Sequence, residues 1–549
     1  MRVLPSGPRA VLVECADLDE ALALHRLLWE HDRPTGLVDA VPGARTLLLV
    51  AASARHLPAL RSRVEDVDAS PLAGAATDRA QAARHGLGHE GPPEVVVPVR
   101  YDGPDLRDVA DHTGLTTEEV VAAHTGRPWT VGFGGFAPGF AYLAGGDPRL
   151  EVPRRGEPRT RVPPGAVGLA GRFSGIYPRS SPGGWQLIGH TDVVLWDLTA
   201  DPPALLRPGM QVRFVDAGRG DHTTSTSAPR SRQAAGPPTT TARTATTDTA
   251  PGEVTATSGT TRRAHLEVLE PGPLALLQDS GRTGHAGVGV GPSGAADRRA
   301  HALGARLLGQ DADCAAVEVH AGGFAVRAHG GVTLALTGAA TAATVDGTPV
   351  AHAAPFHLPG GSVLRLPAPE RGLRTYVSVR GGFDVPAVLG SRSTDTLSGL
   401  GPEPLAPGTL LPVGHAAGHP TVDVAPHPPL PSGTLVLDVV AGPRTAWLAD
   451  AEALVRGEWT VGSASDRVGV RLAGEPLRRP ASLEGRELPS EGVVRGAVQV
   501  PADGQPVVFL ADHPVTGGYP VVAVLTDTAQ DLLAQAVPGQ PVRLRWSRA

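Results

Sequence analysis

The sequence predicts a mainly β protein with some α+β structure, divided into several domains. Its 549 residues include 69 glycines and 54 prolines. Both fractions exceed the usual ~7% and ~5%, so turns and short strands should be abundant. At ~100 to 200 residues per domain, the length predicts several separate cores. A stretch at 216–263, rich in Thr, Ala, Ser, Pro and Gly, cannot form a packed core and divides the chain into two parts.

The first part begins as a small α+β domain and continues as β structure. Asp17 followed by Glu20 predicts a capped amphipathic helix, and Thr116 with Glu119 predicts a second one. Alternating or continuous apolar residues predict strands at 45–50, 94–99, 193–198 and 210–215.

β structure dominates the second part. Periodicity predicts one helix from Ala295 to Leu308. Apolar runs predict strands at 265–272, 331–338, 374–382 and 434–440.

A short pattern occurs once in each part. Gly-Ala-Val at 165–167 precedes Gly-Gly-Trp at 183–185, and Gly-Ala-Val at 496–498 precedes Gly-Gly-Tyr at 517–519. In both cases the Gly-Gly-aromatic turn leads into an apolar run. This repeated pattern favours related β-barrel units in the two parts; the alternative is that the same kind of turn arose twice by chance.

Composition argues against several classes of partner and site. The net charge of -6 and the isoelectric point near 6.4 favour neither nucleic acid nor membrane binding. Cys15 and Cys314 lack the spacing of a zinc site or disulfide framework, and we expect both to be reduced core residues. Glu14 and Asp17 come too early for a signal peptide, and no ~20-residue apolar span follows. We therefore expect a cytoplasmic protein.

The chain contains no lysine, and all of its basic side chains apart from histidine are arginines. A Walker A loop, a pyridoxal phosphate Schiff base and covalent biotin each need a lysine, so none of them is expected on this chain. Recognition of phosphate or carboxylate groups must then fall to arginine or to backbone N–H groups.

The segment 132–189 combines glycines, prolines, arginines and aromatics more densely than any other stretch. Within it, four arginines lie between prolines at 153–164, namely Arg154, Arg155, Arg159 and Arg161. A proline-stiffened loop of this kind can hold an anionic substrate or a nucleotide phosphate. The alternative is a solvated basic loop paired with Glu151 and Glu157.

Polar clusters also stand beside strand ends in the second part. The segment 278–282 (QDSGR) precedes glycines at 287–294, and the helix start that follows can bind an anion through free N–H groups. Asp297 is either a first-turn residue that stabilises the helix dipole or a catalytic base. Near the C-terminus, Gln505, Asp512, His513 and Thr516 can converge on a ligand. No Ser-His-Asp order or metal-ligand spacing of histidines is found.

Six motifs connect the chain to known families. They lie at 124–143 (HTGRPWTVGFGGFAPGFAYL), 147–171, 174–189 (SGIYPRSSPGGWQLIG), 278–300, 465–472 (SDRVGVRL) and 503–520 (DGQPVVFLADHPVTGGYP). Residues 10–215 resemble the B subunit of prokaryotic 5-oxoprolinase, formerly allophanate hydrolase subunit 1. Residues 264–546 resemble the C subunit, formerly allophanate hydrolase subunit 2, and also the carboxyltransferase part of urea carboxylase. Val521 and Asp466 depart from the residues common in these families, which puts the substrate preference in doubt.

The resemblance implies cyclophilin-like β-barrel domains in both halves, which act as one complex. The expected boundaries are 1–88 for a small α+β domain, 89–215 for a cyclophilin-like domain, 216–263 for a disordered linker, 264–430 for a β-barrel domain, and 431–549 for a second cyclophilin-like domain.

The resemblance further implies ATP-dependent opening of 5-oxo-L-proline to L-glutamate, with ATP, Mg²⁺ and a separate A subunit of 5-oxoprolinase. Phosphorylation of the lactam oxygen would create a leaving group before water attacks. The expected catalytic residues are Gln278, Asp279, Arg282, Asp512 and Thr516. The expected substrate or ATP contacts are Phe136, Pro138, Gly139, Arg154, Arg159, Tyr177, Ser181, Gly183, Gly184, Arg467, Gln505 and Tyr519. No protein-bound metal is expected.

Two other functions remain open from the sequence. Biotin-dependent carboxyl transfer to urea or a similar amide would need biotin on another chain, because this one has no lysine. The other open function, a binding protein that regulates a histidine kinase, belongs to a different class. The first half would then correspond to a kinase inhibitor and the second half to its antagonist. A permanent tether between the two suits an enzyme complex better than an independently controlled switch.

Overall fold

The computed structural model describes residues 1–67, 93–218, 263–416 and 419–547. The linker predicted at 216–263 lies almost entirely outside the described residues. So does the end of the predicted domain 1–88. Within the described part, strands outnumber helices and fall into four groups, which confirms the mainly β fold class.

The N-terminal group is a four-stranded antiparallel sheet with helices. Its elements are β1 (Arg2–Pro5), β2 (Ala10–Glu14), α1 (Leu18–His25), β3 (Leu37–Pro42), β4 (Thr46–Ala51) and α2 (Leu57–Glu65), with sheet order β1-β2-β4-β3. Asp17 caps α1 by accepting the Glu20 N–H at 2.9 Å, as its position predicts.

The second group is a seven-stranded sheet with two helices. Its elements are β5 (Glu94–Val99), α4 (Leu106–Thr113), α5 (Thr117–Thr125), β6 (Trp129–Gly135), β7 (Ala137–Ala144), β9 (Ala166–Ala170), β10 (Phe173–Ile176), β12 (Gln186–His190) and β13 (Gln211–Asp216), with β8 (Arg159–Val162) and β11 (Ser181–Gly183) paired beside it. Thr116 and Glu119 form the predicted capping box of α5.

The third group consists of two sheets around one core and a helix. Its elements are β14 (His265–Pro271), β15 (Leu274–Gln278), α6 (Arg298–Leu307), β16 (Ala316–His320), β17 (Phe324–His329), β18 (Val332–Gly338), β19 (Thr344–Val345), β20 (Thr348–Pro349), β21 (Pro355–Leu358), β22 (Val363–Leu366), β23 (Arg374–Val379) and β24 (Leu410–Pro412). Helix α6 starts later than predicted, because Asp297 is its N-cap and accepts the Ala300 N–H.

The fourth group is a closed barrel. Its elements are β25 (Leu435–Ala441), α7 (Glu452–Arg456), β26 (Trp459–Val461), β27 (Gly469–Ala473), β29 (Ala497–Gln499), β30 (Val507–Phe509), β32 (Val521–Leu525), α8 (Asp527–Leu533) and β33 (Pro541–Trp546), with β28 (Glu491–Gly492) and β31 (Thr516–Gly517) paired outside it.

The second and fourth groups share one strand order, so the predicted internal repeat is confirmed. The barrel runs β25-β32-β29-β30-β27-β26-β33, and the earlier sheet runs β5, then β12-β9-β10-β7-β6-β13, with an Arg100–His190 bridge beside β5 and β12. In both, the first and last strands pair in parallel. Trp129 and Trp459 begin equivalent strands, and each indole N–H donates to a backbone carbonyl of the preceding helix region, at 3.0 and 2.9 Å.

The strand predicted at 193–198 is wrong. Its Leu195 is buried and Val194 is exposed, which imitates strand alternation. The segment nevertheless has only an isolated bridge between Trp196 and Ala204. In the seven-stranded sheet β13 already has β5 on one side and β6 on the other. No strand edge is therefore left there with which residues 193–198 could pair.

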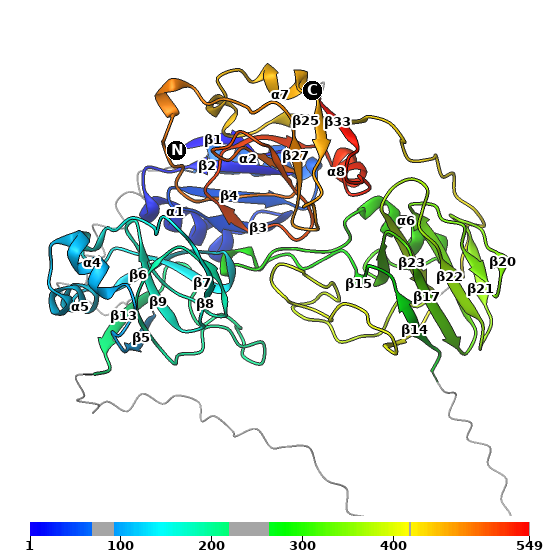
Figure 1. The fold of residues 1–549 in the computed structure, drawn as a ribbon, viewed down its shortest axis with the longest axis horizontal. Helices are drawn as coiled ribbons and strands as arrows, with labels where there is room; N and C mark the ends of the chain where they lie inside the picture. Colours follow the sequence, from blue (N-terminus) through cyan, green and yellow to red (C-terminus); the bar gives the residue numbers. More distant parts are fainter. Residues whose placement is uncertain (68–92, 219–262, 417–418, 548–549) are drawn as a thin grey trace, which may run out of the picture.

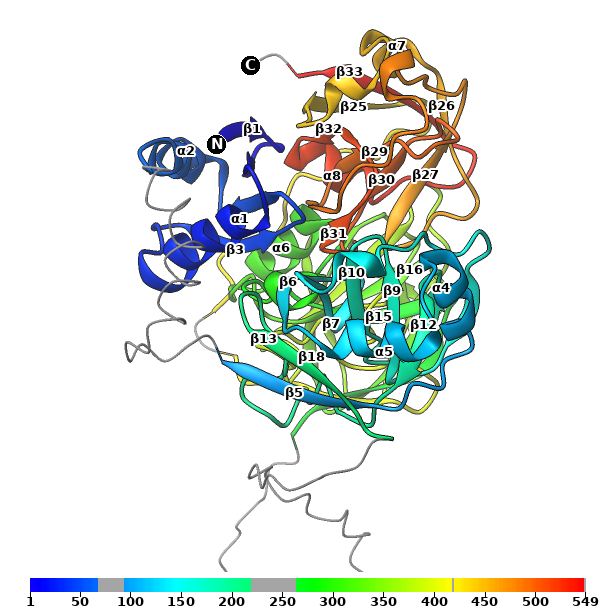
Figure 2. The same ribbon diagram turned by 90° about the vertical axis from the view of Figure 1, so that its left-hand side faces the viewer.

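The N-terminal sheet packs against the C-terminal barrel, far away in sequence (Figures 1 and 2). Leu12 and Leu48 share a buried cluster with Ala286 and Val515. The Arg444 guanidinium contacts Glu14 across this interface and Glu491 on its own side of it. The two halves of the chain are therefore interlocked rather than lying side by side.

Both cysteines are free, as the sequence predicts, but only Cys15 is buried, whereas Cys314 is partly exposed. In the described part of the chain, no helix is both long and apolar enough to cross a membrane.

Candidate functional site at the junction of the two halves

Loops from both halves meet where β6 turns into β7. A Cβ atom on Gly135 would lie 1.9 Å from Thr516 Oγ1, and one on Gly289 would lie 2.4 Å from the Ala137 carbonyl oxygen. A Cβ on Gly134 would lie 2.6 Å from the carbonyl oxygen of Gly287. Glycine is thus required here because the backbones touch directly. The glycine-rich segments 132–139 and 284–297 are complementary surfaces.

Phe136 stands at the centre of this junction. Its backbone has φ of 63°, an uncommon conformation for a non-glycine residue, and its side chain is 38% exposed. The ring packs edge-on against Phe140 and Tyr177, with centroid distances of 5.3 and 6.0 Å. A small cavity beside it is lined by Phe136, Ala137, Pro138, Gly289, Gly291, Asp395, Leu397, Ser398, His513, Pro514 and Val515.

A larger cavity of about 600 Å³ adjoins the small one and shares Leu397 and Pro514 with it. Tyr519, 51% exposed, and Gly518 are two of its lining residues. The other lining residues are Asp466, Val468, Gly469, Arg471, Gln499, Pro501, Val507, Phe509 and Gly517. The predicted residues Phe136, Pro138 and Tyr519 therefore lie along one connected surface.

Two predicted loop arginines are held by a buried carboxylate. Asp105, 2% exposed, accepts from Arg155 Nη1 at 2.8 Å and from Arg159 Nη2 at 2.7 Å, both at Oδ1. Its Oδ2 accepts the Leu187 N–H at 2.6 Å. Arg155 Nε and Arg159 Nη1 are buried without a partner. One carboxylate neutralises only one of the two guanidinium charges, so the cluster keeps a net positive charge.

Some of the other predicted residues of the first half lie beside this cluster. The Ser181 hydroxyl is buried without a partner, and Gly184 accepts the Arg155 backbone N–H at 2.9 Å. A Cβ on Gly183 would lie 2.4 Å from the Tyr177 hydroxyl oxygen. Burial raises the pKa of Tyr177 to about 12. Arg154 is exposed, and Gly139 packs its backbone on Trp196.

The predicted catalytic residues Gln278, Asp279 and Arg282 anchor the segment 391–394. The buried Asp279 carboxylate accepts from the hydroxyls of Ser391 and Ser393, both at 2.6 Å. It also accepts backbone N–H groups at 281 and 392. Three of these donors reach Oδ1 and only the N–H of Arg392 reaches Oδ2, so the carboxylate holds the 391–394 segment in place and keeps one acceptor position at Oδ2.

Unpaired polar atoms flank that carboxylate. Gln278 donates to the Thr394 carbonyl at 2.8 Å, while its Oε1 is buried without a partner. Arg282 donates to the Ser393 carbonyl, and its Nη1 is likewise buried and unpaired. Both atoms are buried polar groups near the junction that remain available for a ligand or water.

A buried ionic network joins the second half together. Arg467, 3% exposed, donates to both oxygens of Asp512 at 2.9 and 3.0 Å and also contacts Glu318. Asp512, fully buried, accepts the Ser293 hydroxyl at 2.7 Å and both the N–H and hydroxyl of Thr396. The network links the barrel to the segments before α6 and after β23.

Charge pairing determines the ionisation of this network. Burial by itself would raise the pKa of Asp512, but Arg467 brings it below the usual value. Burial likewise opposes ionisation of Glu318, yet Arg467 and Arg374 lower its pKa to about 2. Both carboxylates are therefore ionised at neutral pH.

The depressed pKa of Glu318 predicts a pH dependence of stability. A carboxylate whose pKa falls from ~4.3 unfolded to about 2 folded stabilises the fold above pH ~4.3. This contribution should be lost as pH falls from there toward 2. Urea unfolding of the wild type and of Glu318→Gln, measured across this range, should converge at low pH. A difference between the two that does not change with pH would contradict the assignment.

Gln505 is apart from the other predicted residues. Its side chain exchanges hydrogen bonds with the Gly474 backbone at 3.1 and 3.0 Å and lines neither junction cavity. Arg467 lies near the junction, but its guanidinium is already bonded to the carboxylates of Asp512 and Glu318. Thr516 is buried against Gly135.

Sequence reasoning missed Asp105 and Arg179. Arg179 donates to the carbonyls of Ser398 and Leu397, both at 2.7 Å, and so ties the first half to the 391–402 segment. Asp105 precedes α4 and resembles a helix cap, but it makes no capping bond. Its position ahead of a helix gave no sign that its partners are 50 and 54 residues away.

Comparisons with known proteins agree with this division of the chain. Residues 1–206 match the model for carboxyltransferase domain, subdomains C and D, and residues 288–546 match the model for subdomains A and B. The chain is 35% identical to the C subunit of 5-oxoprolinase from Escherichia coli over 282 residues, covering 50% of this chain and 89% of that protein. The chain belongs to the family of the 5-oxoprolinase B and C subunits.

Similarity to the B subunit is higher but shorter. The match to the 5-oxoprolinase B subunit of Escherichia coli O157:H7 is 50% identical over 129 residues, 23% of this chain and 59% of that protein. The crystal structure of TTHA0988 superposes with a TM-score of 0.77 at 33% identity, covering 98% of this chain and all of that one. Urea amidolyase of Saccharomyces cerevisiae is 29% identical over 51% of this chain and 16% of its own length. A 5-oxoprolinase B and C pair fused in one chain accounts for these matches.

Proposed function

We propose that this chain is the fused B and C component of an ATP-dependent 5-oxoprolinase, which opens 5-oxo-L-proline to L-glutamate together with a separate A subunit. One observation carries the proposal. Loops at 132–139 from the B-like half and at 284–297, 395–398 and 513–519 from the C-like half meet around Phe136. A site built from both halves explains why both occur in one protein.

The Arg155 and Arg159 cluster suits an anionic group. The unpaired Arg155 Nε and Arg159 Nη1 offer N–H donors, and the Ser181 hydroxyl adds a third polar atom. Arginine forks bind carboxylate and phosphate groups through such donors. In the proposed reaction the cluster holds either the 5-oxoproline carboxylate or a nucleotide phosphate, with Asp105 fixing both guanidinium planes.

ATP, when bound, would supply the phosphoryl group that turns the lactam oxygen into a leaving group. The chain's own contribution is positioning and charge neutralisation, which phosphoryl transfer mainly requires. Among the described residues, no group of three or more His, Cys, Asp or Glu can hold a metal. Mg²⁺ often binds through substrate phosphates and one or two carboxylates, so such a cluster is not needed.

Carboxyl transfer to urea or a related amide is the second candidate. The matching models describe carboxyltransferase domains, and urea amidolyase is a relative. Because the chain has no lysine, biotin would have to arrive on another protein. Carboxylation of an amide with supplied carboxybiotin, without lactam turnover, would favour this candidate.

Turnover in the presence of the A subunit tests the proposal. The wild type, mixed with a homologue of the 5-oxoprolinase A subunit, should form glutamate from 5-oxoproline and consume ATP. Arg159→Ala should lower this turnover at least tenfold at subsaturating substrate, because it removes one of two guanidinium groups on Asp105. Glutamate and ADP release should be measured together over a range of 5-oxoproline concentrations.

Arg207→Ala is the matched control, since Arg207 is exposed and is not among the groups that donate to the Asp105 carboxylate. Both variants should unfold near the wild-type midpoint. Unchanged turnover in Arg159→Ala would refute the role of this arginine. Absence of any lactam turnover when the wild type is mixed with the A subunit would refute the proposed function.

A further inference from the structure

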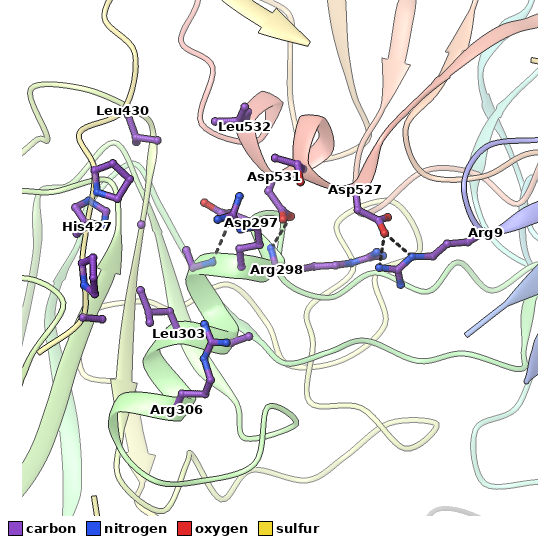
Figure 3. A pocket seen from close by; sticks show the side chains of 18 residues that line it. Arg9, Asp297, Arg298, Leu303, Arg306, His427, Leu430, Asp527, Asp531 and Leu532 are labelled. Atoms are coloured by element: carbon purple, nitrogen blue, oxygen red, sulfur yellow. Dashed lines mark hydrogen bonds and ion pairs between the residues drawn. The ribbon is translucent and has the colours of Figure 1, made fainter. Parts of the chain in front are cut away.

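A second large cavity lies away from the junction, between the two halves. It has a volume of about 790 Å³ and lies between α6, the segment 425–430 and α8, with Arg9, from the turn between β1 and β2, at one end (Figure 3). None of the residues assigned to the proposed reaction lines it. A neighbouring cavity of about 360 Å³ shares Arg9, Arg298 and Asp527 with it.

The carboxylates of the cavity already have partners. Asp527 pairs with Arg9 at 2.6 Å. Asp531 accepts the backbone N–H of Arg298 at 3.0 Å. Asp297 accepts from the backbone N–H of Ala300 and from the Gln535 amide, at 2.9 and 2.8 Å. Each of these carboxylates thus has a donor other than the Arg298 guanidinium.

Arg298 extends from the start of α6 toward Arg9 and Asp527 (Figure 3). Within the described residues, no hydrogen bond or ion pair joins its guanidinium to an acceptor. The neighbouring Arg495, burial and Arg9 lower the pKa of Arg298 to about 9, against the opposing effect of Asp531 and Asp527. A half-buried guanidinium beside two like charges is stabilised by an anion that binds to it directly.

Arg495 adds to this positive charge from the barrel side. It is 6% exposed, and it donates to the carbonyls of Ala295 and Ala296 just ahead of α6. Its Nε is buried without a partner. It lines the smaller cavity together with Arg298 and Arg9. Three arginines from three separate parts of the chain therefore line the smaller cavity together with two carboxylates. Asp527 pairs with Arg9, and Asp39 accepts backbone N–H groups of residues 284 and 286.

We propose that the smaller cavity binds a small oxyanion, a carboxylate or phosphate group, with the Arg298 guanidinium as its main contact and Arg9 and Arg495 beside it. Arg9 belongs to the B-like half, whereas Arg298 and Arg495 belong to the C-like half. The bound anion thus bridges the halves and favours their closed arrangement. The site goes beyond the proposed function and does not depend on it.

Anion binding tests the proposal without any turnover assay. The full-length wild type is titrated by calorimetry with inorganic phosphate and, separately, with succinate, at constant ionic strength. We expect saturable binding of at least one of them, which identifies whether phosphate or carboxylate is preferred. Arg298→Gln should raise the dissociation constant at least tenfold. Arg371→Gln, at an exposed position outside both cavities, should bind like the wild type.

Thermal unfolding separates a binding role from a structural one. Without added anion, Arg298→Gln should be at least as stable as the wild type, because it relieves repulsion from Arg9 and Arg495. With anion, the wild type should gain stability and Arg298→Gln should not. Absence of saturable binding of both probes, or equal binding by wild type and Arg298→Gln, would overturn the proposal. So would a clear loss of stability in anion-free Arg298→Gln.

Discussion

Replacing Arg467 with methionine should lower the free energy of unfolding by about 3 to 5 kcal/mol. The substitution keeps the volume of an unbranched side chain but removes the charge that pairs with Asp512 and Glu318, both buried. An unpaired carboxylate inside a protein costs several kcal/mol or must take up a proton. The effect is large because one guanidinium serves two carboxylates. Urea unfolding at pH 7 measures it.

Arg543→Met provides the matched control, because Arg543 is an exposed residue of the same barrel. It should change the free energy of unfolding by less than about 0.5 kcal/mol. If Arg467→Met were as mild as this control, the network would contribute nothing to the barrel's attachment. Part of the lost stability should return at low pH, where the orphaned carboxylates are protonated.

Replacing Gly289 with alanine should force the two halves apart at the junction. The new Cβ would lie 2.4 Å from the Ala137 carbonyl oxygen, a backbone atom that cannot rotate away. Overpacking typically costs about 1 to 3 kcal/mol, and the φ of +84° adds about 1 kcal/mol for alanine. Ala137 follows Phe136 directly, so displacement at this point also changes the cavity around the exposed ring. Urea unfolding should show the loss of stability, and lactam turnover in the presence of the A subunit should fall as well.

Gly361→Ala separates backbone strain from the clash. Gly361 has φ of +88°, but an added Cβ would meet nothing within 4 Å. It should therefore lose only about 1 kcal/mol and keep its turnover. Equal losses in Gly289→Ala and Gly361→Ala would show that close contact between the halves at Gly289 is unimportant.

Local sequence rules predicted most of the secondary structure, because caps and alternation are short-range features. Asp17 and Thr116 cap helices where expected, and residues 94–99 form a strand. The segment 193–198 failed because alternation indicates one buried face but not whether a neighbouring strand is available. The pairing of the N-terminal sheet with the C-terminal barrel was likewise beyond local rules, since it joins residues such as Arg9 and Asp527.

The candidate site was predicted in part for the same reason. Glycine and aromatic motifs marked the loops that meet, because close backbone contact demands particular residues at particular positions. Sequence could not distinguish which charged groups face a ligand and which satisfy one another. Arg467 and Asp512 were expected at a site, and the structure pairs them with each other. Asp105, whose carboxylate holds two arginines, stood in an unremarkable turn.

The parallel pairing of first and last strands also affects how quickly each barrel can form. Glu94 lies opposite Gln211 in one, and Leu435 lies opposite Val542 in the other. Neither seam can close until the ends of a whole domain have met, and the entropy of that loop must be lost before the seam contributes. We expect barrel closure to be a late and slow event in folding. Until then the edges of β5 and β25 are unpaired strands, the kind of surface on which nascent chains aggregate.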